Sequence, residues 1–221
     1  MKMTIIFRIS ILTLLMTEGH LSGAGLQFIV DYPRQDKEEV VEGRVLLLLS
    51  QNDEKEPRFQ ISDNSTTGFV FGLDAIGKQA PEGVTIDNNI FGYPVSSLDD
   101  IPAGEYWAQG LIHQYETFDL KTGHRVKLPM DRGEGQRWHS APGNYYSTPK
   151  KINLDPKKRK TIKITLNQKI PAIEPPEDTE YVKHIRIQSK LLSEFWGRPM
   201  HLGAHVLLPQ GYNEHPEARY P

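Results

Sequence analysis

The segment from Asp131 to Tyr146 carries the side chains best suited to hold a small ligand. It mixes glycine, charged residues and flat aromatic rings without strand alternation, as in a loop that presents a binding surface. The rings could stack on a sugar or an aromatic ester. The candidate substrate-binding residues are Trp138, Tyr145 and Tyr146 as stacking rings, with Arg137 and His139 as polar contacts. The alternative is that these rings pin a long loop to its own domain or to a neighbouring one.

Other polar pairs give no catalytic or metal-binding pattern. The chain has no cysteine, which excludes disulfides, thiolate-bound zinc, iron–sulfur clusters and a thiol nucleophile. His201 and His205 have the spacing of a zinc-binding helix, but on a strand these positions lie about 13 Å apart. Asp99 and Asp100 are adjacent, so on an extended chain they point in opposite directions. We therefore expect no catalytic residue, no metal site and no cofactor in this chain.

Charge and composition exclude further classes of protein. The chain has 221 residues, with 26 lysines and arginines against 28 aspartates and glutamates, and a formal net charge of -2. This balance argues against a nucleic-acid-binding protein, which needs a net basic field. Hydrophobic residues make up 38% of the chain, enough for a packed core. The 18 glycines and 16 prolines favour strands joined by turns over long helices.

Residues 1–24 have the parts of a secretory signal peptide. Lys2 and Arg8 precede the apolar run Ile9–Met16, and small residues follow at Ser22–Ala24. The run is far shorter than the ~20 residues of a membrane-spanning helix. We therefore expect a secreted or periplasmic protein without a membrane span, and the lack of cysteine favours a bacterial source. The alternative is a start that is disordered or is not a targeting signal.

Residues 25–170 alternate mostly with a period of two, as in β-strands. The short apolar run 44–49 is typical of a strand covered on both faces, and 105–115 predicts a central strand buried on both sides. Residues 161–166 alternate cleanly, which places Ile162, Ile164 and Leu166 inside. Helical structure is expected at most as a short piece near 36–41. Together these patterns predict a mostly β domain, an Ig-like antiparallel β-sandwich.

A proline-rich segment divides the chain. Residues 171–180 combine prolines with acidic neighbours, as in a stiff extended linker. Beyond it, 182–191 and 200–208 alternate around a turn at 197–199, which predicts a β-hairpin within 181–221. An isolated two-stranded ribbon is marginal in water, so this hairpin needs a larger body. We expect three of its apolar side chains to be less buried than core residues: Ile187, Val206 and Leu208.

Roughly the last forty residues resemble the opening of a known family. The matching stretches are Lys183–Leu192, Phe195–Met200, Val206–Tyr212 and Tyr220–Pro221. They are similar to the putative-esterase branch of the α/β-hydrolases, which includes esterase D-like and enterochelin esterase-like enzymes. In that family the two opening strands end in a Leu-Pro-x-Gly-Tyr turn, and Tyr-Pro introduces the first buried parallel strand. Earlier stretches resemble the N-terminal domain of some secreted members: Gly92–Val95, Ile101–Gln109, Leu128–Asp131 and Ser140–Tyr146.

The resemblance implies ester hydrolysis through a Ser-His-Asp acyl-enzyme mechanism. The family's nucleophile lies in a Gly-x-Ser-x-Gly turn with Asp and His later in the chain, and no serine here has glycine at both positions. The triad would therefore lie beyond Pro221. The implied function is the N-terminal region of a secreted esterase-like serine hydrolase, giving substrate positioning or domain packing. Its partners would be its own C-terminal hydrolase domain and an ester or carbohydrate ligand.

Two alternatives belong to other classes. The chain could be a stand-alone glycan-binding β-sandwich whose sheet the hairpin completes, or a purely structural interaction module.

Overall fold

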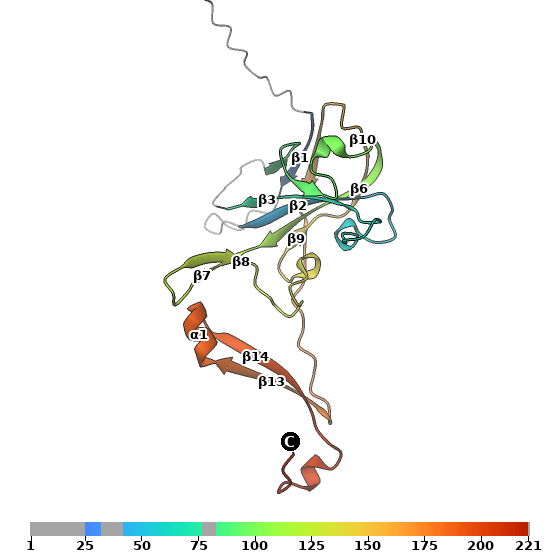
Figure 1. Cartoon of the computed structure of the whole chain (residues 1–221). Coiled ribbons are helices and arrows are strands. Elements are labelled where there is room, and N and C mark those ends of the chain that lie inside the picture. The colour runs from blue at the N-terminus through green and yellow to red at the C-terminus, as the bar shows by residue number, and fades with distance from the viewer. Residues whose placement is uncertain (1–24, 32–41, 77–82, 221) are drawn as a thin grey trace, which may run out of the picture.

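The computed structural model describes residues 25–31, 42–76 and 83–220 (Figure 1). The predicted signal peptide 1–24 and the predicted short helix near 36–41 lie outside the described residues. The fold is mostly β with several antiparallel sheets, as the alternation predicted. We call the described residues up to Ile170 the body, and residues 181–220 the C-terminal unit.

The strands of the body form two larger sheets and one small hairpin. Their bounds are β1 Leu26–Asp31, β2 Gly43–Ser50, β3 Phe69–Ala75, β4 Val84–Ile86, β5 Gly92–Tyr93, β6 Gly104–Gln114, β7 Glu116–Asp119, β8 Arg125–Leu128, β9 Tyr145–Tyr146, β10 Lys150–Leu154, β11 Lys160–Thr165 and β12 Gln168–Lys169. Short 3-10 helices lie between them: η1 Pro57–Phe59, η2 Leu98–Asp100 and η3 Trp138–Ser140.

The first sheet has the strand order β11-β1-β4. β1 pairs antiparallel with β4 but parallel with β11, with Leu26 opposite Lys160 and Asp31 opposite Thr165. The expectation of a wholly antiparallel body is therefore wrong at this pair. β1 and β11 stand far apart in the sequence, so no tight hairpin turn imposes opposite directions on them.

The second sheet has the order β12-β9-β6-β2-β3-β5, and β10 also pairs with β6. β6 pairs antiparallel with β2 along its length on one side, and with β9 and β10 on the other. This long strand is therefore central, as the pattern of residues 105–115 predicted.

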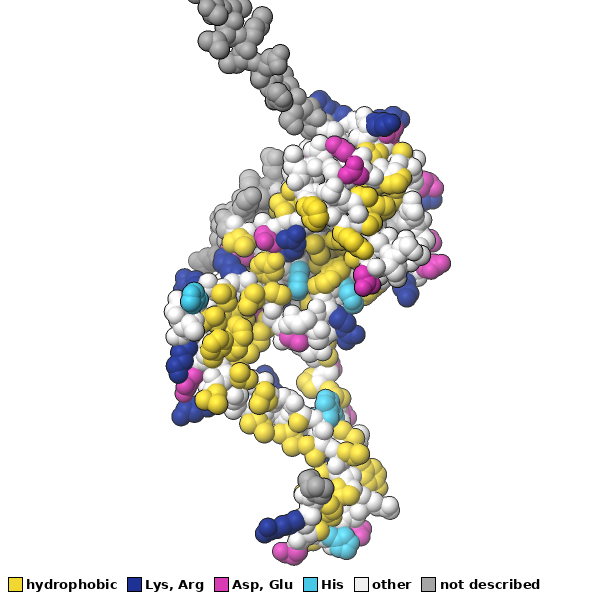
Figure 2. Space-filling model, in the orientation of Figure 1, with side chains coloured by type: hydrophobic (Ala, Val, Ile, Leu, Met, Phe, Trp, Pro, Cys, Tyr) yellow, Lys and Arg dark blue, Asp and Glu magenta, His cyan; other side chains and the backbone are white. Residues whose placement is uncertain are grey.

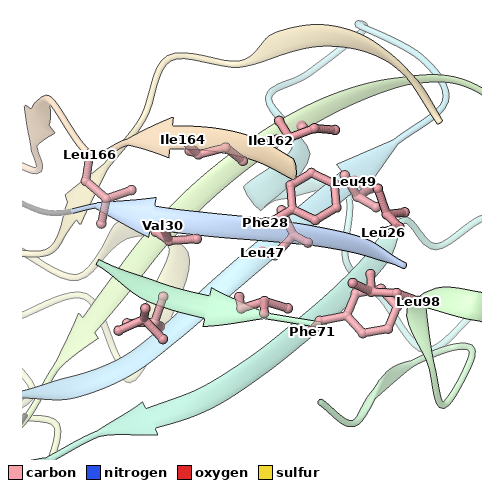
Figure 3. Close-up of a cluster of buried hydrophobic side chains, with 14 of the residues drawn as sticks. Leu26, Phe28, Val30, Leu47, Leu49, Phe71, Leu98, Ile162, Ile164 and Leu166 are labelled. Carbon is pink, nitrogen blue, oxygen red and sulfur yellow. The ribbon is translucent and has the colours of Figure 1, made fainter. Parts of the chain in front are cut away.

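Side chains of the two sheets meet in one hydrophobic core (Figure 3). Phe28 and Val30 of β1 are fully buried, and the predicted inward residues of the β11 segment are at most 6% exposed. Leu47 and Phe71 face them from the second sheet. Burial of one such side chain stabilises the fold by about 1.5–3 kcal/mol, so this shared core holds the two sheets together.

The far face of the second sheet has a smaller cluster of its own. Leu46 and Leu48 of β2 lie there with Leu111 of β6, and Trp138 of η3 and Tyr146 of β9 pack against them. β2 and β6 are therefore buried on both faces, as predicted, although loops rather than a further sheet form the second cover.

The C-terminal unit consists of β13 Val182–Ser189, α1 Lys190–Trp196, β14 Met200–Leu207 and η4 Tyr212–Glu214. The predicted hairpin is present, with Val182 opposite Leu207 and Ser189 opposite Met200. A strand running to residue 191 is wrong, because α1 begins at Lys190. The Ser189 side chain accepts a hydrogen bond from the Leu192 N–H and caps this helix, which ends at Gly197 with a φ of 66°.

No described residue after Ile170 is buried, and each residue of the linker 171–180 is exposed. Ile187 is 61% exposed, and Val206 and Leu208 are only half-buried, as predicted. The ribbon of β13 and β14 extends away from the body, with hydrophobic side chains along its surface (Figures 1 and 2). The C-terminal unit therefore adds nothing to the core. Among the described residues, no helix has the length and apolar character needed to cross a membrane.

Truncation of two leucines compares the core with the C-terminal unit. Leu47 is fully buried, so Leu47→Ala should lower the free energy of unfolding by about 2–5 kcal/mol. Leu202 is 55% exposed on β14, so the same change there should cost less than about 0.5 kcal/mol. Urea unfolding followed by tryptophan fluorescence measures both. Equal losses would mean that Leu202 belongs to a packed core, against this description.

Candidate functional site

The predicted binding residues lie in the loop between β8 and β9 and in β9 itself. Arg137 precedes η3, Trp138 and His139 are part of it, and Tyr145 and Tyr146 form β9. β9 pairs with the central strand β6, which anchors the end of the loop to the second sheet.

The two tyrosines face opposite sides of the sheet because they are adjacent on a strand. Tyr145 is 8% exposed and belongs to the core between the sheets, where the Lys169 Nζ atom lies 5.1 Å from its ring centroid. Tyr146 packs on the far face against the cluster that contains Leu46 and Leu111. A ring as buried as that of Tyr145 offers no face for stacking. The three predicted rings therefore do not form one surface.

The loop is fastened to the body at its C-terminal end. The Asn144 Nδ2 donates to the Trp138 carbonyl at 2.9 Å, and its Oδ1 accepts from the Gln114 N–H at 3.0 Å. The Gly143 N–H donates to the Ile170 carbonyl at 2.9 Å. Asn144 is 1% exposed, so these bonds satisfy polar groups that water cannot reach. This arrangement favours the alternative that the aromatic residues pin the loop.

Arg58 of η1 packs against the Tyr146 ring on the far face of the second sheet, and the sequence did not single it out. It is 8% exposed, and its guanidinium carbon lies 4.4 Å from the Phe59 ring centroid and 4.1 Å from that of Tyr146. Its Nη1 donates to the His139 carbonyl at 2.9 Å, and its Nε donates to a Glu56 carboxylate oxygen at 2.8 Å. A nearly buried cation thus occupies ring faces on which a ligand would stack.

Gln109 of β6 ties this arginine to the sheet. Its Oε1 accepts from the Arg58 N–H at 3.0 Å, and its Nε2 donates to Glu56 at 2.7 Å and to the Ser147 carbonyl at 2.8 Å. Gln109 is fully buried, and each bond offsets the cost of removing its amide from water. An amide inside an otherwise buried strand is a sequence signal for such a network, but alternation alone does not name the partners.

His139 is half-buried, and its buried Nδ1 atom has no hydrogen-bond partner among the described residues. The ring packs edge-on against Phe59 and Trp138, with centroids 5.2 Å and 5.5 Å away. Burial lowers the pKa of His139, and the positive charges of Arg137 and Arg58 lower it further. The ring is therefore neutral at neutral pH, which suits packing among aromatic rings.

Arg137 is the exposed member of the predicted set. Its Nε donates to the Glu134 carbonyl at 2.7 Å. Glu134 is 3% exposed, and its carboxylate accepts from the Arg132 N–H at 2.8 Å. Burial lowers the pKa of nearby His113, and the charge of Glu134 acts in the opposite direction. These contacts fold the loop on itself instead of opening a cleft.

Three histidines of the C-terminal unit, His184, His201 and His205, lie on the polar face of its ribbon. His201 and His205 both lie on β14, as predicted, and stand opposite Gln188 and His184. The His184 and His205 rings contact edge-to-face at 4.6 Å. In the part of the chain that the structure describes, no three histidine, aspartate or glutamate side chains gather closely enough to hold a metal ion.

Comparison with models of protein families, with curated proteins and with solved structures finds no match to this chain. The similarity to putative esterases therefore rests on the residues quoted above. We call the segment 129–146, which joins β8 to β9 and includes β9, the aromatic loop; its contacts with Gln114 and Arg58 fasten it to the body.

Replacement of Arg58 tests whether it fastens the loop. Arg58→Met keeps much of the apolar stem but removes the charge, so the His139 carbonyl loses its donor and Glu56 keeps only the bond from Gln109. We expect a loss of about 2–3 kcal/mol in the free energy of unfolding. The control is Arg44→Met, whose pair with Asp74 is 44% and 46% exposed and should matter by at most ~1 kcal/mol. Urea unfolding measures both, and a loss at Arg58 no larger than the control would contradict the role.

Proposed function

We propose that this chain is the N-terminal region of a secreted esterase-like serine hydrolase, and that it provides domain packing without any catalytic residue of its own. The carrying observation is that the C-terminal unit forms a regular hairpin with a helix, yet none of its described residues is buried. An amphipathic ribbon of this kind is expected where further sheet and helices cover it.

The two faces of the ribbon differ in character. Directly opposite residues share a face, so Ile185 lies beside Ala204, and Ile187 beside Leu202. Ile187 and Leu202 are 61% and 55% exposed. The other face carries the pair His184 and His205 with Arg186, Gln188 and His201, and it has an apolar pair, Val182 and Leu207, only at its end. One apolar and one polar face match a sheet that is covered on one side by a packed layer.

The resemblance to putative esterases suggests which layer would cover the apolar face of this ribbon. In the esterase family, the equivalent strands open the hydrolase sheet, whose later part supplies the Ser-His-Asp triad and the oxyanion hole. We further propose that the body is an Ig-like sandwich, supported by the two facing sheets that share one core. Secretion to a bacterial periplasm or exterior belongs to the same proposal and rests on the pattern of residues 1–24.

Of the two roles that the resemblance implies, domain packing has the stronger support. Tyr145 is buried, and Arg58 covers the ring of Tyr146, so the aromatic loop leaves little surface for a substrate. The glycan-binding alternative draws support from another place, the edge strand β5. Gly92 there faces the Phe71 ring, and its neighbours Phe91 and Tyr93 are 72% and 42% exposed.

Ester hydrolysis by the chain and by the product of the complete gene tests the proposal. The purified chain should fold but should neither hydrolyse p-nitrophenyl esters nor react with a fluorophosphonate serine probe. The complete product should do both, because its nucleophile lies in the added residues. Serine-dependent turnover by this chain alone would contradict the proposal. An inactive and unlabelled complete product would exclude the hydrolase and leave the binding module.

A further inference from the structure

The C-terminal unit touches the body at one side of the β7–β8 hairpin (Figure 1). The Lys121 N–H, in the turn of this hairpin, donates to the Phe195 carbonyl at 2.8 Å. The Trp196 ring meets the Phe118 ring edge-on, with centroids 5.2 Å apart. A Cβ on Gly197 would lie 2.5 Å from the Asp119 carbonyl oxygen, so only glycine allows this approach.

Glu116 of β7 adds charge to this contact. One carboxylate oxygen accepts from Arg198, whose guanidinium also lies 5.2 Å from the Phe118 ring centroid. The other oxygen accepts from Arg132, which lies in the aromatic loop. Arg132 also donates to the Pro142 carbonyl at 2.6 Å. A single carboxylate therefore bonds both the aromatic loop and the C-terminal unit.

We infer that the outer face of the β7–β8 hairpin is the docking surface that orients the C-terminal unit, and that Glu116 couples this unit to the aromatic loop. The docking surface consists of Glu116, Phe118, Asp119 and Lys121. Its occupant is the segment Phe195–Arg198 of the same chain. The inference deepens the domain-packing role and rests on it only in treating the C-terminal unit as part of a separate domain.

The linker and the neighbouring ion pair contribute little to the orientation of the C-terminal unit, which leaves the docking surface to fix it. Each residue of the linker 171–180 is exposed, so the linker supplies little packing of its own. Phe118 is 3% exposed, so the ring that Trp196 contacts is shielded from water. The nearby pair of Lys121 and Glu194 is 66% and 45% exposed, and a pair so open to water contributes little.

Burial raises the pKa of the Glu116 carboxyl, but hydrogen bonds and charge from Arg198 and Arg132 outweigh it and hold that pKa below its usual value. The carboxyl is therefore ionised at neutral pH, as two charge-assisted hydrogen bonds require. Glutamine at this position keeps the shape, but it has no negative charge and its amide nitrogen is a donor, so it can accept from only one of the two arginines.

Hydrogen exchange of single amides tests the inference on the intact chain. The Lys121 amide reports docking, because its recorded acceptor is Phe195 of the C-terminal unit. The Arg132 amide, which bonds Glu134, reports the loop. In Glu116→Gln, both amides should exchange about tenfold faster, since weaker charge-assisted bonds let each partner open more often. The control Glu105→Gln removes the exposed pair with Lys151 and should change neither amide.

Arg198→Met provides a variant whose change lies outside the body. The Lys121 amide should exchange faster by a similar factor. The Arg132 amide should exchange faster by a smaller factor, because Arg198 acts on the loop only through Glu116. An unchanged Lys121 amide in both variants would overturn the docking surface. Faster exchange of the Lys121 amide with unchanged exchange of the Arg132 amide would overturn the coupling. Neither readout involves ester hydrolysis, so this test can fail while the proposed function stands, and the reverse.

Discussion

The longer strands among the described residues have an apolar face that must be removed from water, and the two parts of the molecule meet this constraint differently. In the body, two sheets turn their apolar faces toward each other, and loops cover the far side of β2 and β6. In the C-terminal unit, the apolar face of β13 and β14 meets no other layer. The body buries its apolar faces within itself, whereas the C-terminal unit leaves the apolar face of its ribbon exposed.

The aromatic loop shows how a surface that resembles a binding site can serve packing instead. Its arginine, tryptophan, histidine and tyrosine side chains are the types that recognise sugars and aromatic esters. In the structure, Arg58 fills the space between two rings, and Asn144 closes the loop on β6. Arg132 of the loop also donates to Glu116, and Glu116 accepts from Arg198 of the C-terminal unit. Glu116 therefore connects the aromatic loop with the C-terminal unit.

Local patterns predicted the features that depend on alternation. They placed β6 at the centre, predicted that β2 is covered on both faces, turned Ile162 and Ile164 inward, and anticipated the exposure of Ile187. They missed the parallel pair of β1 and β11, because pairing between distant segments has no local signal. They missed α1, whose cap at Ser189 competes with strand continuation. Arg58 was missed because its role depends on its contact with Tyr146, a residue distant in the sequence that only the fold brings close.

Hydrogen exchange of the β13 and β14 amides, compared between this chain and the product of the complete gene, tests the central claim most directly. The account holds that the ribbon lacks its covering layer here. It predicts exchange at least ~100-fold faster in this chain than in the complete product, because an uncovered ribbon opens locally. Equal and strong protection in both would mean that the C-terminal unit is stable by itself, and would contradict the account.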